Sequence, residues 1–366
     1  MKKALVYNFY LQTAGGGERL SLDICLALSK LGYQITIATS PLFQRSLDSL
    51  CRVFGLPTDL GWHLVRFETE EAVFEYCRLH SFDVFVNGTF CSSLKNPARV
   101  GIYPVMFPQF PDQEVRARLL TYQLILCISD FTEIYTKAWW GQDDGVRTLP
   151  PPISESHASY SDVIFEAKEK LILNVGRFNV DGHCKRQLDA IRVFNRLRAK
   201  GILDSDWKLF LVGNLNEGEH NRRYLEQCFE EASLGVHIET DVPFERIQSL
   251  YRSASVLWQF TGYGLPYGES PQYCEHLGLV ALDSLHYGTL PIVYERSGVA
   301  HMIRYGETGF VFSSTSELER IMDLVDKFFG SWAHRELFQN ACKASTELDF
   351  NSFVGKLDAY ISELAA

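Results

Sequence analysis

The sequence has little positive charge for its length. Its 366 residues include 35 Lys and Arg against 45 Asp and Glu, which gives a formal net charge of −10. Proteins that bind nucleic acids carry basic stripes that neutralise phosphates, and no such stripe is visible in the sequence. The charge balance therefore argues against nucleic acid as the main partner, while it allows a local basic pocket for a single nucleotide.

Long apolar segments and paired cysteines are also lacking. No run approaches the roughly 18 apolar residues that span a bilayer, and the apolar part of MKKALVYNFY is too short for a signal peptide. The 9 cysteines are scattered singly, without C-x-x-C pairs or histidine clusters at metal-ligand spacing, which is typical of reduced thiols in a cytoplasmic protein. We therefore expect a soluble, cytoplasmic protein without a metal site.

The residues that are present alternate between strand and helix patterns. Ala4–Phe9 is a short apolar run, LSLDICLALSKLG has apolar residues at helical spacing, and Tyr33–Thr39 is again apolar. This βαβ opening predicts a parallel sheet with a ligand site at the carboxyl ends of its strands. The rhythm restarts at Leu171–Val175, after the proline run of Leu149–Ser154, which we interpret as a linker. With 46% hydrophobic residues, the α/β chain is long enough for two domains with separate cores.

Other segments lead to more local expectations. Pro41–Phe54 and Ser352–Leu364 are predicted to be amphipathic helices. Ser129 is predicted to cap the helix DFTEIYTKAWW, which should end at Gly141. Tyr103–Pro111, YPVMFPQFP, is so rich in proline and aromatic residues that we expect a packed loop instead of regular structure.

The glycines after the first strand do not complete a cofactor fingerprint. The loop LQTAGGGER would let a ligand approach the backbone closely, but the G-x-G-x-x-G pattern fails at Leu20, and the second strand, YQITIATSP, ends without an acid. The sequence also contains no P-loop. A dehydrogenase that uses a nicotinamide cofactor is therefore disfavoured.

The stretch Tyr273–Pro291, YCEHLGLVALDSLHYGTLP, reads as loop, helix, stop and strand entry. Gly278 stands where the chain turns into the helix, and the small, uncharged first turn lets backbone N–H groups face an anion. Glu275 precedes that turn and Asp283 lies inside the helix, and carboxylates accept hydrogen bonds from sugar hydroxyls. The pattern suits a ligand with both phosphate and hydroxyl groups. The alternative is an ordinary capped helix with two solvated acids.

A basic pair accompanies this stretch. In NVGRFNVDGHCKRQ a strand ends at Gly176 and Arg177, and Lys185 with Arg186 starts a helix. In a parallel sheet both places lie at the same edge as the Glu275 turn. Two fixed cations there would hold a diphosphate and stabilise it as a leaving group. The alternative is a solvated basic helix start, which is disfavoured because cations are slightly unfavourable at a helix N-terminus.

The order of several motifs resembles a known family. GGGER near the N-terminus and ISDFTEIYTKAWWG before the proline run are followed by VGRF…KRQ, FLVG, WQFTGYG, EHLGLVALDSLHYGTLPIV and IRYGETGFVF. This order, over nearly the whole chain, resembles the retaining glycosyltransferases of family 4, whose GT-B fold has two Rossmann-like βαβ domains facing across a cleft. GGGER and EHxG are most similar to the subgroup of the dolichol-linked mannosyltransferase of asparagine-linked glycan assembly.

The resemblance implies domains and roles for individual residues. It implies an acceptor-side domain at residues 1–153, a nucleotide-sugar-binding domain at residues 154–348, and a C-terminal helix, residues 349–366, that crosses back to the first domain. By the family pattern, Arg177 and Lys185 grip the donor diphosphate, and no metal or other cofactor is required. The other implied donor-binding residues are the acids Glu275, by the sugar, and Asp283, at the ribose. They also include Gly176 at a strand end and the helix-start residues Gly16, Gly17, Gly278, Leu279 and Val280.

Two positions depart from the family pattern. The second acid, Asp283, is one methylene shorter than the usual Glu, so we expect a longer or water-mediated ribose contact. Relatives often have a donor-contacting His in the loop that corresponds to YPVMFPQ, where this chain has Met106. The resemblance therefore implies altered sugar recognition, a different residue in the role of the His, or weaker activity.

We predict a hexosyltransferase that moves a mannose- or glucose-type sugar from GDP- or UDP-hexose to an acceptor hydroxyl, with retention of configuration. Arg177, Lys185 and Glu275 are the predicted catalytic residues. The acceptor is expected to be a glycan, a lipid-linked glycan or a small molecule, and a lipid-linked acceptor would place the protein peripherally at a membrane. Two alternatives stay open: a non-catalytic nucleotide-sugar-binding protein of the same fold, and a sugar-nucleotide epimerase.

Overall fold

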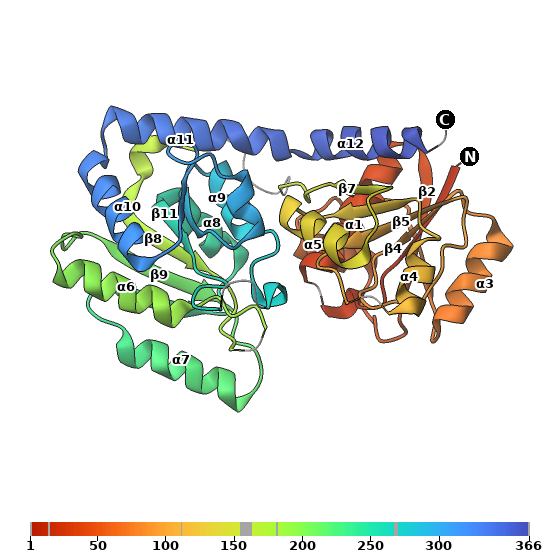
Figure 1. Cartoon of the computed structure of the whole chain (residues 1–366), viewed down its shortest axis with the longest axis horizontal. Coiled ribbons are helices and arrows are strands. Elements are labelled where there is room, and N and C mark those ends of the chain that lie inside the picture. The colour runs from red at the N-terminus through yellow and green to blue at the C-terminus, as the bar shows by residue number, and fades with distance from the viewer. Residues whose placement is uncertain are drawn as a thin grey trace. The chain divides into compact units, whose positions relative to one another are not determined.

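The computed structural model describes residues 2–13, 15–110, 112–153, 163–180, 182–266 and 270–364. The chain forms two compact units (Figure 1). The first comprises Met1–Ser156 together with Leu348–Ala366, and the second comprises His157–Glu347. Each unit is built around a parallel sheet of its own, which confirms the predicted α/β class with two Rossmann-like domains.

The first unit contains a 7-stranded sheet in the order β3-β2-β1-β4-β5-β6-β7. Its central strands are continuous apolar runs because helices cover both faces of a parallel sheet; β4 and β5, for example, are buried at every residue. The strands are β1 Lys2–Tyr7, β2 Tyr33–Thr39, β3 His63–Arg66, β4 Val84–Asn87, β5 Val100–Val105, β6 Leu124–Cys127 and β7 Val146–Thr148.

Polar side chains start most helices of this unit. The N-cap residues Ser46, Thr69, Asp112 and Ser129 each accept a hydrogen bond from a backbone N–H of the first turn. The capping role predicted for Ser129 is thus confirmed, and Gly141 ends its helix in the left-handed conformation. The helices are α1 Gly16–Lys30, α2 Leu47–Val53, α3 Glu70–His80, α4 Gln113–Leu119, α5 Asp130–Trp140 and α12 Phe350–Glu363.

The last helix, α12, packs against α1, and Figure 1 shows it running along the first unit. The ammonium of Lys30 lies 4.5 Å from the centre of the Phe350 ring, and the Tyr360 hydroxyl donates to the Thr148 carbonyl at 3.1 Å. These contacts make the C-terminal helix part of the first unit, although the chain has passed through the second unit to reach it.

The expectation for Tyr103–Pro111 was wrong in its first part, because β5 runs through Pro104 to Val105. The Val105 carbonyl accepts from the N–H of Ile128, the residue after β6. Successive residues of a strand direct their backbone groups to opposite neighbours, so the backbone nitrogen of Pro104 faces β4. Pairing with β4 ends at Ile102, so the missing N–H of Pro104 removes no bond from the ladder. Pro111 lies outside the described residues.

Three boundaries also differ from prediction. The helix expected at Pro41–Phe54 begins only at Leu47, because Ser40 starts a turn before it. Helix α1 begins at Gly16, so the glycines form its first turn instead of a loop before it. Leu149 and Ile153 of the predicted linker are buried in the first unit, and Ser154 lies outside the described residues.

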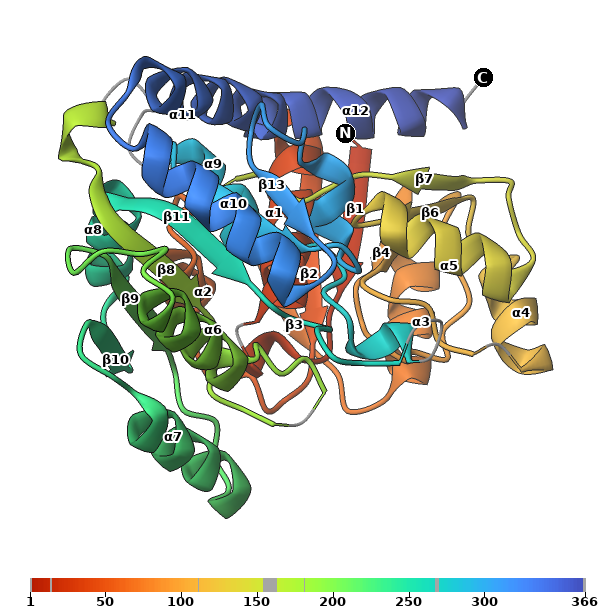
Figure 2. The ribbon, with the colours of Figure 1, turned by 60° about the vertical axis from the view of Figure 1, so that its left-hand side comes forward.

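The second unit contains a 6-stranded sheet in the order β10-β9-β8-β11-β12-β13. Helices α6 and α7 lie side by side, and α11 packs on α9 (Figures 1 and 2). The strands are β8 Glu169–Val175, β9 Lys208–Gly213, β10 Val236–Thr240, β11 Ala254–Gln259, β12 Leu290–Tyr294 and β13 Phe310–Phe312. The helices are α6 Gln187–Ala199, α7 Glu219–Glu231, α8 Phe244–Ser253, α9 Leu279–His286, α10 Thr315–Phe328 and α11 Trp332–Ser345.

A buried lysine ties the amino end of this sheet together. Lys168, just before β8, donates to the carbonyls of Tyr251 and Ala254 and to the hydroxyl of Thr289, at 2.8 to 2.9 Å. Three acceptors match the three donors of an ammonium group. Three neighbouring strands are therefore fixed at this end, and the opposite, carboxyl end is where the loops of the candidate site emerge.

Candidate functional site

Two loops of the second unit leave neighbouring strands at the carboxyl edge of the sheet. Strands β8 and β11 pair in parallel. The chain continues from β8 toward β9 on one side and from β11 toward β12 on the other, so the strand order reverses between them. Loops diverge at such a reversal and leave a crevice in which ligands bind. The loop after β8 carries Gly176, Arg177 and Lys185, and the loop after β11 leads to Glu275.

A charged hydrogen bond joins the two loops. The Lys185 ammonium donates to Glu275 Oε2 at 2.5 Å, and the side chains are only 19% and 13% exposed. Thr261 also donates to that oxygen, at 3.3 Å. A Cβ added at Gly176 would overlap the Lys185 side chain, so glycine lets the lysine stem cross the end of β8. The structure thus brings together three residues that the sequence singled out.

Positive charge holds Glu275 ionised despite its burial. Burial alone raises the pKa of the carboxyl, but the Lys185 ammonium and the hydrogen bond it donates lower the pKa to about 2. Burial lowers the pKa of His183 and, to about 3, that of His276. Their rings meet edge to face, with centroids 4.4 Å apart. The site therefore contains a lysine–carboxylate pair beside two neutral imidazoles at pH 7.

A buried amide fixes the backbone that carries the second predicted cation. Gln187 Nε2 donates to the carbonyls of Gly176 and Arg177, at 3.0 and 3.1 Å, and Gln187 Oε1 accepts from the Tyr224 hydroxyl at 3.2 Å. The Arg177 residue itself is exposed. Its backbone is therefore held rigidly while its guanidinium faces solvent.

Three residues after Glu275, the chain turns sharply into α9. Gly278 is the N-cap, with φ 87° and ψ 54°, a left-handed conformation that favours glycine. No side chain caps α9 and no acid lies in its first turn, so the N–H groups of Leu279 and Val280 are N-terminal donors without helical partners. Asp283 is half-buried on the next turn. This is the helix start that the sequence predicted, and it is suited to an anion.

The remaining predicted residues lie in the first unit. Gly16 and Gly17 form the first turn of α1. A Cβ added at Gly17 would lie 3.6 Å from the Met106 methyl carbon, so Met106 lines this glycine turn. Gly16 and Gly17 belong to a different unit from Lys185 and Glu275.

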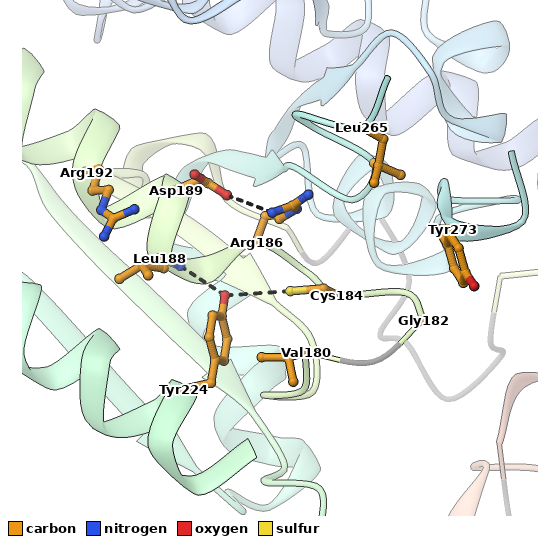
Figure 3. Close-up of a pocket in the computed structure, with 11 residues that line it drawn as sticks. Val180, Gly182, Cys184, Arg186, Leu188, Asp189, Arg192, Tyr224, Leu265 and Tyr273 are labelled. Carbon is orange, nitrogen blue, oxygen red and sulfur yellow. Dashed lines mark hydrogen bonds and ion pairs between the residues drawn. The ribbon is translucent and has the colours of Figure 1, made fainter. Parts of the chain in front are cut away.

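A pocket of about 450 Å³ lies next to the site in the second unit (Figure 3). Its walls come from residues adjacent in sequence to the predicted ones, such as Cys184 and Arg186 on either side of Lys185, and Tyr273 near Glu275. Arg186 points toward Asp189, at 3.8 Å, and the Tyr224 hydroxyl points toward Cys184 (Figure 3). Cys184 and Arg186 thus line the pocket, while Lys185 between them bonds to Glu275.

The comparison with known families decides the identity. A family model described as glycosyl transferases group 1 matches residues 160–344, just over half of the chain. The chain belongs to this family. No curated protein sequence matches the chain.

Several solved structures are similar to this group 1 glycosyltransferase over its whole length. A glycosyltransferase from Rickettsia africae superposes with a TM-score of 0.74 at 11% identity, over 100% of this chain and 99% of that one. HepE from Anabaena, solved with UDP and glucose, gives 0.71 at 14% identity, over 99% and 100%. Sucrose-phosphate synthase from Thermosynechococcus elongatus gives 0.69 at 15%, over 100% and 99%. The predicted GT-B fold is confirmed.

Several site residues were not foreseen from the sequence. Thr261 donates to Glu275, and His183 and His276 lie near that carboxylate. Gln187 holds the loop after β8. All four lie within the quoted motifs: His183 and Gln187 in NVGRFNVDGHCKRQ, Thr261 in WQFTGYG, and His276 directly after Glu275. Their proximity in sequence to the predicted residues was a usable signal, whereas the contact between His183 and His276 depends on the fold.

Proposed function

We propose that this glycosyltransferase binds the diphosphate of a nucleotide sugar in its second unit and transfers the sugar to an acceptor hydroxyl. The observation that carries the proposal is the Lys185–Glu275 pair at 2.5 Å, three residues before an uncapped helix start. Positive charge and backbone donors meet a carboxylate there. A ligand with phosphate and hydroxyl groups needs this combination.

The cations would supply most of the catalysis. Glu275 uses one of the three N–H donors of Lys185, which leaves donors for phosphate oxygens. The exposed Arg177 guanidinium adds a second cation on a fixed backbone. With the N–H groups of Leu279 and Val280, these groups stabilise the negative charge that grows on a leaving diphosphate. No metal ion is part of the proposal, because the protein itself provides this positive charge.

The carboxylates of Glu275 and Asp283 would bind sugar hydroxyls. Both hydrogen bonds that the described residues make to the Glu275 carboxylate fall on Oε2, so Oε1 accepts from a hydroxyl of the transferred hexose. Asp283, farther along α9, accepts from the ribose. In a retaining transfer the bond from sugar C1 to the diphosphate oxygen breaks, and the acceptor oxygen bonds C1 on the same face. The acceptor proton passes to the leaving diphosphate, so no separate base is required.

The donor and acceptor classes follow from the motifs and from the relatives. UDP- or GDP-linked hexose of glucose or mannose type is proposed as the donor, in keeping with the HepE structure in complex with UDP and glucose. A glycan or lipid-linked glycan is proposed as the acceptor, as in the mannosyltransferase subgroup that GGGER and EHLG resemble. The GGGER turn, with Gly16 and Gly17, is proposed to contact the donor from the first unit.

A transfer assay tests the proposal. Purified protein is incubated with UDP-glucose, UDP-galactose or GDP-mannose, with and without a panel of glycan and lipid-linked acceptors, and released nucleotide and products are measured. We expect release of UDP or GDP that an acceptor accelerates, and near-complete loss in the Arg177→Ala, Lys185→Ala double variant. Normal transfer by that variant would refute the assigned roles.

Two other results would support the alternatives. Binding of a nucleotide sugar without any release indicates a non-catalytic protein, and Met106 beside Gly17, where relatives often have His, is the observation that favours it. Conversion of the sugar nucleotide into its epimer without an acceptor indicates an epimerase.

A further inference from the structure

Strand β11 ends on a buried amide that has no partner. Gln259 is 3% exposed, and neither its Nε2 nor its Oε1 has a hydrogen-bond partner. Burying an amide without a partner is unfavourable, and such groups are rare in folded proteins. Packing alone would be served better by an apolar side chain of similar length. The amide therefore calls for a functional explanation.

A second glutamine in the same unit shows what a structural amide looks like. Gln187 is fully buried, yet its Nε2 donates to two carbonyls and its Oε1 accepts from Tyr224. Both glutamines lie at the carboxyl edge of the same sheet. The neighbourhood thus has backbone and hydroxyl groups that can satisfy a buried amide, and Gln259 is not placed to use them.

The Gln259 amide is aimed at the start of α9. A Cβ added at Gly278 would lie 3.1 Å from Gln259 Nε2, so the amide lies against the bare backbone of the N-cap residue. Helix α9 has 8 residues, no side-chain cap and no acid in its first turn. Two residues beyond Gln259, Thr261 already donates to Glu275. The last residue of β11 thus places its side chain at the helix start, and the loop after β11 places the Thr261 side chain at the carboxylate.

We propose that Gln259 is a further donor-binding residue, whose amide N–H bonds the diphosphate held at the α9 start. The inference rests on the proposed function, because it needs a diphosphate at that helix. The amide is desolvated in advance by folding, so its bond to a phosphate oxygen does not require the removal of water at the moment of binding. It adds a side-chain donor to the backbone donors of Leu279 and Val280. Gln259 thereby forms the floor of the anion site, below Gly278.

Two leucine variants separate a ligand-binding amide from a structural one. Gln259→Leu removes an amide without partners, so we expect a melting temperature equal to or above that of the wild type. Gln187→Leu leaves two carbonyls and a hydroxyl without their partners and is expected to melt lower. Dissociation constants for UDP and GDP are then measured by calorimetry on wild type and Gln259→Leu. For whichever nucleotide the wild type binds, we expect affinity to fall about 10- to 100-fold in Gln259→Leu.

Further measurements locate the contact. The corresponding monophosphate, UMP or GMP, should lose less affinity than the diphosphate in Gln259→Leu, and Gln259→Glu should bind the diphosphate more weakly still because it adds a negative charge. Unchanged diphosphate affinity in Gln259→Leu would overturn the inference. A melting temperature as low as that of Gln187→Leu would overturn it too, since the amide would then be structural. Failure of the wild type to bind UDP or GDP would instead overturn the proposed function on which it rests.

Discussion

Helices α1 and α9 of this glycosyltransferase both begin at glycines, and their N-termini differ in what surrounds them. At α1, the carboxylate of Glu18 folds back onto the N-cap and accepts from the Gly15 N–H at 2.7 Å and from the Thr13 hydroxyl at 2.8 Å. At α9, the nearest carboxylate, Glu275, turns away to Lys185. The first helix start therefore carries an anion of its own, and the second does not.

The difference shows how a similar glycine turn can serve stability or binding. A carboxylate in the first turn offsets the positive end of the helix dipole and so reduces the attraction for another anion. Helix α9 has no acid in its first turn, and the unpartnered amide of Gln259 lies beside its start. We therefore propose the start of α9, and not that of α1, as the diphosphate site.

The largest expected effect comes from removing the ammonium at the second helix start. Lys185→Met keeps the stem that crosses Gly176 but leaves the buried Glu275 without its cation. We expect kcat/KM for sugar transfer to fall about 100- to 1000-fold, as for the loss of a group that stabilises a developing charge. Lys200→Met is the matched control, because Lys200 also pairs with a carboxylate, Glu319 at 2.6 Å, but the Lys200 side chain is 51% exposed against 19% for Lys185. A loss of less than threefold in Lys185→Met would remove Lys185 from the mechanism.

A smaller effect is expected from filling the bare N-cap. Gly278→Ala forces alanine into a left-handed conformation and places its Cβ 3.0 Å from Val299 Cγ1. Gly306→Ala has the same backbone problem, at φ 75°, with no atom within 4 Å. We expect each variant to lose about 1 kcal/mol of stability from the backbone alone, and Gly278→Ala to lose more. Equal melting temperatures for the two variants would show that the α9 start is not crowded.

The smallest effect is expected at the first helix. Glu18→Ala removes the acceptor of the Gly15 N–H and of the Thr13 hydroxyl, which should lower the free energy of unfolding by about 1 kcal/mol. Thermal unfolding measures this, with Glu71→Ala, an exposed acid in the first turn of α3, as the control. Because Glu18 acts on stability, UDP or GDP should bind the folded variant as tightly as the wild type. A tenfold change in that affinity would break the contrast between the two helices.

Much of the candidate site in the second unit could be predicted from the sequence, because its features are local. Glu275 and Gly278 lie in the segment that leads into the apolar-periodic helix α9, and Gly176 lies at the end of β8 in the separate β8–α6 segment. Local patterns likewise predicted the helix that Ser129 caps. Such features depend on backbone propensity and side-chain periodicity, which a sequence displays directly.

The rest depends on which strands become neighbours. The bond between Lys185 and Glu275 joins residues 90 positions apart, and it exists because β8 and β11 are adjacent in the sheet. Pro104 is tolerated within β5 only because β4 stops pairing at Ile102. The unpartnered state of Gln259 is also invisible in the sequence, since the composition of β11 does not show which groups surround its last residue. These facts belong to the packed sheet.

A crystal structure of the protein with UDP or GDP bound tests the central claim most directly. We expect the diphosphate oxygens to lie within hydrogen-bond distance of the Leu279 and Val280 N–H groups and of the Lys185 ammonium. We also expect no phosphate oxygen beside the Glu18 carboxylate at the start of α1. A diphosphate bound instead in the pocket of Arg186 and Tyr273, without contact to α9, would contradict it.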